Sequence, residues 1–172
     1  GVAPVAGWEV YGRISGDSYV FALKAPTGTS IGAETTAWFN TDQNINSGYQ
    51  IFPTLDAEGN IIVPSGGAEF NINFSSGGVP FLFTGGAGAT PVSTDPMLFG
   101  RSADGTTVEF AVAKSAIGNP TGLDALFDVN NTAFLPGNFS GPQYSVLDNS
   151  GLPLRTDFSK KVAIVYSEST AE

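Results

Sequence analysis

Short segments in which apolar and polar side chains alternate with a period of two recur along this chain. The clearest covers residues 34–42, Glu-Thr-Thr-Ala-Trp-Phe-Asn-Thr-Asp. In an extended strand, this alternation places Trp38 and Asn40 on one face and Ala37 and Phe39 on the other. The first face is therefore polar and carries a large aromatic ring.

A second strand of this kind is predicted at residues 69–74, Glu-Phe-Asn-Ile-Asn-Phe. Its apolar side chains point toward a core, whereas Glu69, Asn71 and Asn73 point away from it. A solvated sheet face usually carries Thr, Lys and Glu. A stripe of amides and a carboxylate beside an aromatic ring indicates instead a surface that holds a polar, ring-shaped ligand such as a sugar.

The remaining strands are predicted from similar runs bounded by Gly, Pro, Asn and Asp. Residues 8–14 and 19–24 form one expected hairpin, and residues 53–55 and 61–63 form a small one across an Asp-Ala-Glu-Gly-Asn turn. The other expected strands are 49–52, 79–84, 97–99, 107–112, 124–129 and 143–147. Ala113–Ile117, closed by Gly118, is the single expected helical turn.

About ten short strands with hardly any helix predict an all-β fold, a two-sheet antiparallel β-sandwich of jelly-roll-like form. We expect residues 1–159 to form this sandwich as one domain. Residues 160–172 differ, because Lys-Lys-Val-Ala-Ile-Val-Tyr is a continuous apolar run behind two lysines. Such a run is typical of a buried parallel strand, so this tail is expected to lead into a following α/β domain.

Charge and composition narrow the possible partners. The chain of 172 residues has 7 basic and 16 acidic side chains, a net charge of −9, which predicts no nucleic-acid partner. No apolar run approaches the ~18 residues of a membrane span, so no membrane insertion is expected. The first residues lack the regions of a signal peptide. We expect a piece of a larger exported protein, secreted or at the cell surface.

The chain contains no cysteine and no histidine. These absences exclude a disulfide framework, thiolate metal sites and any Ser-His-Asp or Cys-His catalytic arrangement. Two carboxylates such as Glu69 and Asp42 are the groups that a glycosidase uses, but no nucleophile motif accompanies them. The sequence therefore predicts that the protein is not an enzyme.

The order of several motifs resembles the DOMON-like β-sandwiches, and among them most closely the family 9 carbohydrate-binding modules of large exported bacterial proteins. The resemblance covers roughly residues 8–150 and depends on motif order, since each motif is loose. The motifs are Tyr-Val-Phe-Ala-Leu at 19–23, Trp-Phe-Asn-Thr-Asp at 38–42, Gly-Ala-Glu-Phe-Asn-Ile-Asn-Phe at 67–74, Ser-Ala-Asp-Gly-Thr-Thr-Val-Glu-Phe-Ala-Val at 102–112 and Lys-Ser-Ala-Ile-Gly at 114–118.

This resemblance implies a non-catalytic sugar-binding module with aromatic platforms, often with structural calcium. Some relatives in the wider group bind haem through a Met and a His. Met97 is present here, but without any histidine that ligand pair cannot form, so no haem is expected. The paired tryptophans of such sugar-binding modules are not evident, because Trp8 and Trp38 are far apart in sequence.

The predicted ligand site uses Trp38 as the surface on which a sugar ring stacks. The alternative is that Trp38 packs under the loop at residues 85–96, and that its polar neighbours are only a solvated face. Trp8 is expected to close one end of the sandwich. The polar and aromatic contacts predicted beside Trp38 are Asn40, Tyr49, Glu69, Asn71 and Asn73.

Calcium sites are predicted where carboxylate and amide oxygens cluster. One pair is Asp42 with Asn44, and the other is Asp128 with Asn130. The turn at residues 56–60 is a third candidate. Asp and Asn side chains in turns also cap the backbone, and backbone capping is the alternative interpretation at all three candidate calcium sites.

Two functions follow as hypotheses. The first is a calcium-stabilised, non-catalytic carbohydrate-binding module that attaches its parent protein to a polysaccharide or other glycan, in adhesion or targeting. The alternative is a structural or spacer domain whose sheet face contacts neighbouring domains of the same chain.

Overall fold

The computed structural model describes residues 7–74, 79–86, 90–93, 97–137, 139–141, 143–147 and 155–156. Within them, two antiparallel sheets and two small two-stranded ribbons make up most of the structure. The predicted all-β sandwich is confirmed. No helix in these ranges is long and apolar enough to cross a lipid bilayer.

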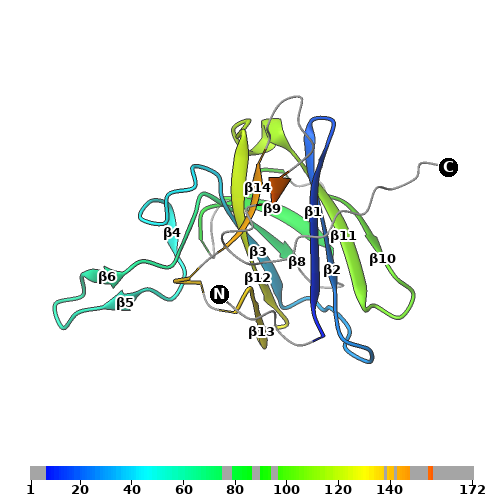
Figure 1. Ribbon diagram of the computed structural model, residues 1–172, viewed down its shortest axis with the longest axis horizontal. Coiled ribbons are helices and arrows are strands. Elements are labelled where there is room, and N and C mark those ends of the chain that lie inside the picture. Colours follow the sequence, from blue (N-terminus) through cyan, green and yellow to red (C-terminus); the bar gives the residue numbers. More distant parts are fainter. Residues whose placement is uncertain are drawn as a thin grey trace.

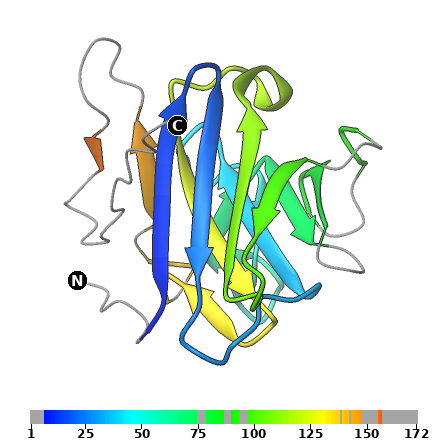
Figure 2. The ribbon, with the colours of Figure 1, turned by 90° about the vertical axis from the view of Figure 1, so that its right-hand side faces the viewer.

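The first sheet has four strands in the order β1-β2-β11-β10. Figure 2 shows them side by side in front, with strands of the other sheet crossing behind. Their bounds are β1 Glu9–Ser15, β2 Ser18–Lys24, β11 Thr107–Ala113 and β10 Leu98–Arg101. The expected hairpin at the start of the chain is β1 with β2. Strand β2 also pairs with β11, which lies more than 80 residues later in the sequence.

The second sheet has the order β15-β14-β12-β3-β8-β9, and β13 also pairs with β12. The alternating segments at residues 34–42 and 69–74 form its interior strands β3 and β8. Their bounds, with those of the others, are β3 Thr35–Asn40, β8 Phe70–Phe74, β9 Pro80–Thr84, β12 Gly122–Val129, β13 Ala133–Leu135, β14 Tyr144–Leu147 and β15 Arg155–Thr156.

The main core lies between the two sheets and contains several packed aromatic rings among aliphatic side chains. Phe21 of β2 stacks on Phe39 of β3 with 5.2 Å between ring centroids, and it meets Phe127 of β12 edge-on at 5.9 Å. Ile72 and Phe74 of β8 are fully buried in the same core. The predicted inward faces of β3 and β8 are therefore confirmed.

Smaller elements complete the fold. β4 (Tyr49–Gln50) pairs with β7 (Gly66–Ala68), and β5 (Thr54–Leu55) pairs with β6 (Ile61–Val63). The hairpin β5–β6 was predicted and projects away from both sheets (Figure 1). The helical turn is the 3₁₀ helix η1 (Lys114–Ile117), which ends at Gly118 in the left-handed conformation, as predicted.

Tyr49, predicted as a contact beside Trp38, does not lie on a strand that pairs with the strand of Trp38: among the described residues β4 pairs only with β7. The tail at residues 160–172, with its expected passage into an α/β domain, lies outside the described residues. Trp8 is half-buried and packs against the main core.

Candidate functional site

The ligand-binding residues predicted from the sequence lie together on the outer face of the second sheet. Trp38 pairs with Asn71 of β8 on one side and with Leu126 of β12 on the other. Thr36 and Asn73 form the next pair along the strands. The period of two therefore placed these side chains on the correct face.

Trp38 is nevertheless not exposed. Its side chain is only 9% accessible and belongs to a second apolar cluster on this outer face, with Ile51, Ala68, Leu126 and Phe139. The segment that connects β3 to β8 and the loop before β14 bring three of these residues over the sheet. The prediction of Trp38 as a solvent-exposed platform is thus wrong, because long-range packing covers the indole.

The polar side chains around Trp38 bond mainly to the protein's own loops. Asn40 is 2% exposed; its Nδ2 donates to the carbonyl of Gly66, and its Oδ1 accepts from the backbone N–H of Asn44. Asn71, 4% exposed, donates to the carbonyl of Gly85 at 2.6 Å. These amides fasten the covering segments to the sheet, and a ligand would have to displace those bonds.

Glu69 behaves in the same way, while two other predicted contacts stay accessible. The Glu69 carboxylate accepts from the backbone N–H of Thr41 at 2.8 Å. Asn73 is exposed, and Tyr49 is 41% exposed. Only Tyr49 and Asn73 are therefore open to an outside molecule without rearrangement.

The first predicted calcium pair caps a turn. One oxygen of Asp42 accepts from the backbone N–H of Asn44 at 2.8 Å, and the other accepts from the Ser47 hydroxyl at 2.7 Å. The side chain of Asn44 accepts from the backbone N–H of Asn46. Among the described residues, no group of three or more His, Cys, Asp or Glu could hold a metal ion. The side-chain oxygens of Asp42 and Asn44 therefore cap the backbone as in Asx turns.

The second pair lies at the opposite end of β3 and β12. Asn130 accepts from the backbone N–H of Gly32 at 2.7 Å and donates to the carbonyl of Ser30, so it fixes the loop before β3. Asp128 has one buried oxygen without a hydrogen-bond partner among the described residues, and burial raises the pKa of this carboxyl. Calcium binding at this pair stays a prediction.

The turn at residues 56–60, the third candidate for calcium, is also capped internally. The Asp56 carboxylate accepts from the backbone N–H groups of Glu58 and Asn60 and from the Asn60 amide. These bonds lower the pKa of Asp56, with the Asn60 side chain as the main cause. The turn therefore keeps its negative charge at neutral pH.

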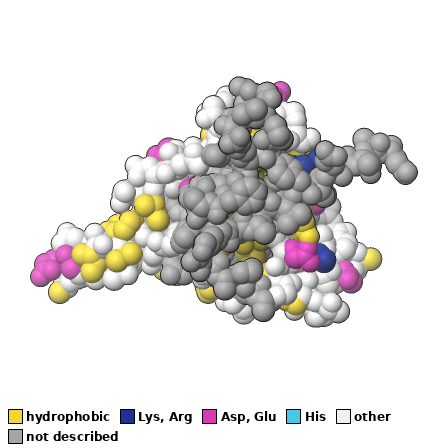
Figure 3. Space-filling view, viewed as in Figure 1, with side chains coloured by type: hydrophobic (Ala, Val, Ile, Leu, Met, Phe, Trp, Pro, Cys, Tyr) yellow, Lys and Arg dark blue, Asp and Glu magenta, His cyan; other side chains and the backbone are white. Residues whose placement is uncertain are grey.

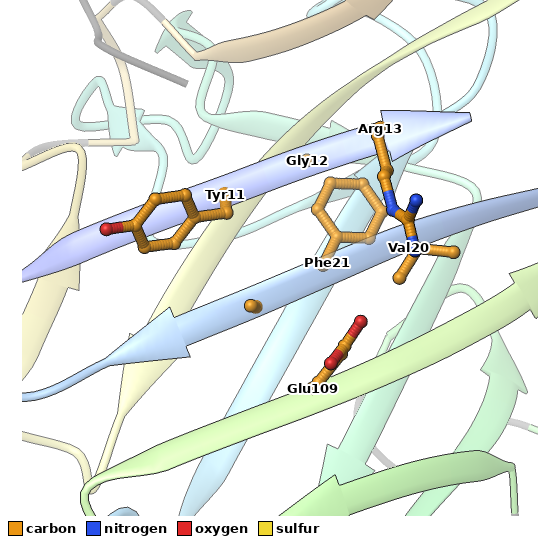
Figure 4. A pocket seen from close by; sticks show the side chains of 7 residues that line it. Tyr11, Gly12, Arg13, Val20, Phe21 and Glu109 are labelled. Carbon is orange, nitrogen blue, oxygen red and sulfur yellow. The ribbon is translucent and has the colours of Figure 1, made fainter. Parts of the chain in front are cut away.

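A different group of chemically active side chains lies on the outer face of the first sheet. The register places Tyr11 of β1, Ala22 of β2 and Glu109 of β11 in one row, and Arg13 and Val20 in the next. Figure 4 shows Arg13 and Glu109 on either side of Val20, with Tyr11 farther along β1. The small side chain of Ala22 leaves the floor of this face low.

The geometry is that of a shallow hollow open to solvent. Together with the exposed side chain of Leu98 on β10, Arg13, Val20 and Glu109 line a space of ≈ 360 Å³. A smaller depression next to it contains Tyr11 and Ala22 (Figure 4). Small-molecule sites occupy about 300–1,000 Å³, so the hollow has room for a ligand of one or two sugar rings.

Among the described residues, the charges of Arg13 and Glu109 in this hollow have no partner. The guanidinium of Arg13 and the carboxylate of Glu109 make no hydrogen bond or ion pair with any described residue. At the rim, by contrast, Lys24 pairs with Glu9 at 2.8 Å, and the Tyr11 hydroxyl donates to the same carboxylate. Arg13 and Glu109 are therefore free to bond to a ligand.

Comparison with known proteins gives no further guidance. No family model, no curated protein and no solved structure matches this chain. The likeness to the DOMON-like sandwiches consequently stays a prediction.

The hollow on the first sheet was missed in the sequence. The alternation in residues 8–14 does place Tyr11 and Arg13 on one face of a strand, and this was the available signal. Glu109 joins them only because β2 pairs with β11, a contact between segments far apart in sequence. Local periodicity carries no information on that pairing.

Proposed function

We propose that this chain is a non-catalytic carbohydrate-binding module and that the sugar binds on the outer face of the first sheet. The observation that carries the proposal is the combination of a Tyr11 ring, a low floor at Ala22 and the unpaired groups of Arg13 and Glu109. The face around Trp38, favoured by the sequence, supports it less because the indole is covered.

The chemistry of these groups suits a sugar. A tyrosine ring offers a flat apolar surface for the C–H face of a pyranose. A guanidinium donates in a plane to neighbouring hydroxyls, and a carboxylate accepts from them. A ring in the hollow can approach Arg13 and Glu109 together, and the small side chain of Ala22 leaves the way open to Tyr11 in the adjacent depression.

Binding to a glycan array tests the proposal. We expect Tyr11→Ala to weaken binding several-fold, up to about tenfold, since stacking on one aromatic ring contributes roughly 0.5–1.5 kcal/mol. Tyr49→Ala is the matched control, because Tyr49 is an exposed tyrosine on the separate ribbon β4–β7. No binding by the wild-type chain, or loss of binding in Tyr49→Ala alone, would reject the site.

The second candidate function is a structural or spacer domain of a larger protein, which contacts neighbouring domains instead of a glycan. The specific observation in its favour is the row of exposed apolar side chains on the hairpin β5–β6. For either function, a secreted or cell-surface location remains our expectation from the sequence.

A further inference from the structure

The hairpin β5–β6 and its flanks form an apolar projection, here called the arm (residues 51–65). Figure 1 shows it extending from the body of the molecule, and Figure 3 shows apolar side chains along it with acidic ones at the tip. The exposed fractions of its large apolar side chains are Phe52 75%, Ile62 60%, Leu55 49%, Ile61 49% and Val63 40%. Such a concentration is typical of an interaction surface.

The arm is held in a defined shape. At its tip, the Asp56 carboxylate caps the turn through the backbone N–H groups of Glu58 and Asn60. At its base, the backbone N–H of Ile51 donates to the carbonyl of Ser65 at 2.7 Å, and the Ser65 N–H donates to the Gln50 side chain. A surface that is fixed before binding loses little conformational entropy on association.

Two properties indicate that another β-rich or apolar surface covers the arm. An isolated two-stranded ribbon is only marginally stable in water. Edge strands are usually protected by charge, proline or short length, and residues 51–55 and 61–65 contain one proline each but no charged residue that would keep an apolar partner away. The only charges of the arm are Asp56 and Glu58 at its tip.

A complementary surface lies at the base of the arm on the same chain. It is a shallow hollow of ≈ 210 Å³, here called the basal hollow. Phe134 meets Phe52 edge-on at 6.5 Å and Phe139 edge-on at 5.5 Å, which makes one aromatic cluster. The residues that line the hollow carry no charge: Ile51, Phe52, Ser65, Phe134, Gly137, Phe139 and Ser140.

We propose that a second copy of this chain covers the arm, with two arms side by side and antiparallel about a two-fold axis. In this arrangement, the apolar side chains near the tip of each arm pack into the basal hollow of the other copy. One chain supplies both halves of the contact, as a two-fold interface requires. This dimer is independent of the proposed sugar site, which lies on the first sheet.

The exposed apolar area of two arms is large enough for this dimer, whereas the net charge of the chains opposes it at long range. The ten large apolar side chains of two arms expose on the order of 1,000 Å², about the lower limit for a biological interface. Antiparallel arms place their acidic tips at opposite ends of the contact, so the tips do not approach each other. Each chain still carries −9, and the two copies repel each other at long range.

Sedimentation velocity of the 172-residue chain between about 1 and 100 μM tests the proposal. We expect the weight-average mass to double with concentration, and added NaCl to strengthen the dimer because it screens the repulsion. Ile62→Lys should weaken association at least tenfold. Leu98 is 79% exposed and lines the proposed sugar hollow on the first sheet, so Leu98→Lys is a control for association alone and should leave the concentration dependence of the mass unchanged.

Single cysteines locate the contact, because the native chain has none. When Leu55→Cys and Phe134→Cys chains are mixed under mild oxidation, we expect a disulfide-linked heterodimer. The mixture of Leu55→Cys with Leu98→Cys should not form one. A wild-type monomer at every concentration, unchanged association of folded Ile62→Lys, or equal cross-linking in both mixtures would overturn the proposal.

Discussion

The ring of Tyr49 stacks on the indole of Trp38, with 5.4 Å between centroids and 18° between planes. Tyr49 is the exposed partner and Trp38 the buried one. A methyl group added at Gly86 would come within 2.3 Å of Tyr49 Cδ2, so the ring of Tyr49 also packs closely on the chain after β9. The aromatic pair therefore joins three separate segments over the second sheet.

Removal of the outer ring should expose the inner one. We expect Tyr49→Ala to lower the free energy of unfolding by about 1–2 kcal/mol, since it removes a stacked ring that is already partly solvated. In a Trp8→Phe background, Trp38 is the single tryptophan, and its fluorescence emission should shift to longer wavelength. An unchanged emission maximum with native circular dichroism would contradict the described burial.

Asn71 and Asn73 are two residues apart on the same strand and face, and they should behave differently. Asn71→Ala leaves the carbonyl of Gly85 without its donor, and we expect a loss of about 1–3 kcal/mol in urea unfolding. Asn73→Ala removes an exposed side chain and should change stability by less than about 0.5 kcal/mol. Equal losses for the two variants would show that the Asn71 amide does not hold the loop.

Gly67 tests how the segment that covers Trp38 is fixed. Its φ is +67°, and a Cβ there would lie 2.8 Å from the backbone of Asn44 and of Ile45. Gly67→Ala should therefore cost more than the roughly 1 kcal/mol of a strained φ alone. Gly59→Ala is the control: its φ is +87° with no atom within 4 Å of the added Cβ. Thermal unfolding of the two variants gives the comparison.

The raised pKa of the Asp128 carboxyl predicts that the free energy of unfolding depends on pH. Burial raises the pKa of its carboxyl in the folded chain, so the folded state holds the proton more tightly than the unfolded state. Its contribution favours folding below the unfolded pKa and is lost as pH rises through the folded one. We expect Asp128→Asn to be more stable than wild type at pH 7.

Low pH provides the control for the Asp128→Asn variant. As the pH falls below the folded pKa of Asp128, the wild-type carboxyl becomes neutral, and the advantage of Asp128→Asn should shrink. Urea unfolding at a series of pH values measures this difference. A constant difference across that series would mean that Asp128 titrates normally.

The sequence by itself determined most of the strands and, in β3 and β8, which way their side chains point. Alternation in β3 and β8 placed Phe39, Ile72 and Phe74 in the core and Trp38 with Asn71 outside, and the register confirms it. The turn around Asp56 and the end of the helical turn at Gly118 were also predicted from the sequence. These features depend on residues close in sequence, where steric and hydrogen-bonding preferences act locally.

Tertiary structure alone decided what covers each face. Trp38 became interior because Ile51 and Phe139, from two distant segments, fold over it. Arg13 and Glu109 became neighbours because β2 pairs with β11. Both results depend on which long-range contacts bury the most apolar surface at the least cost in chain entropy. The alternation of side chains within one strand does not specify those contacts.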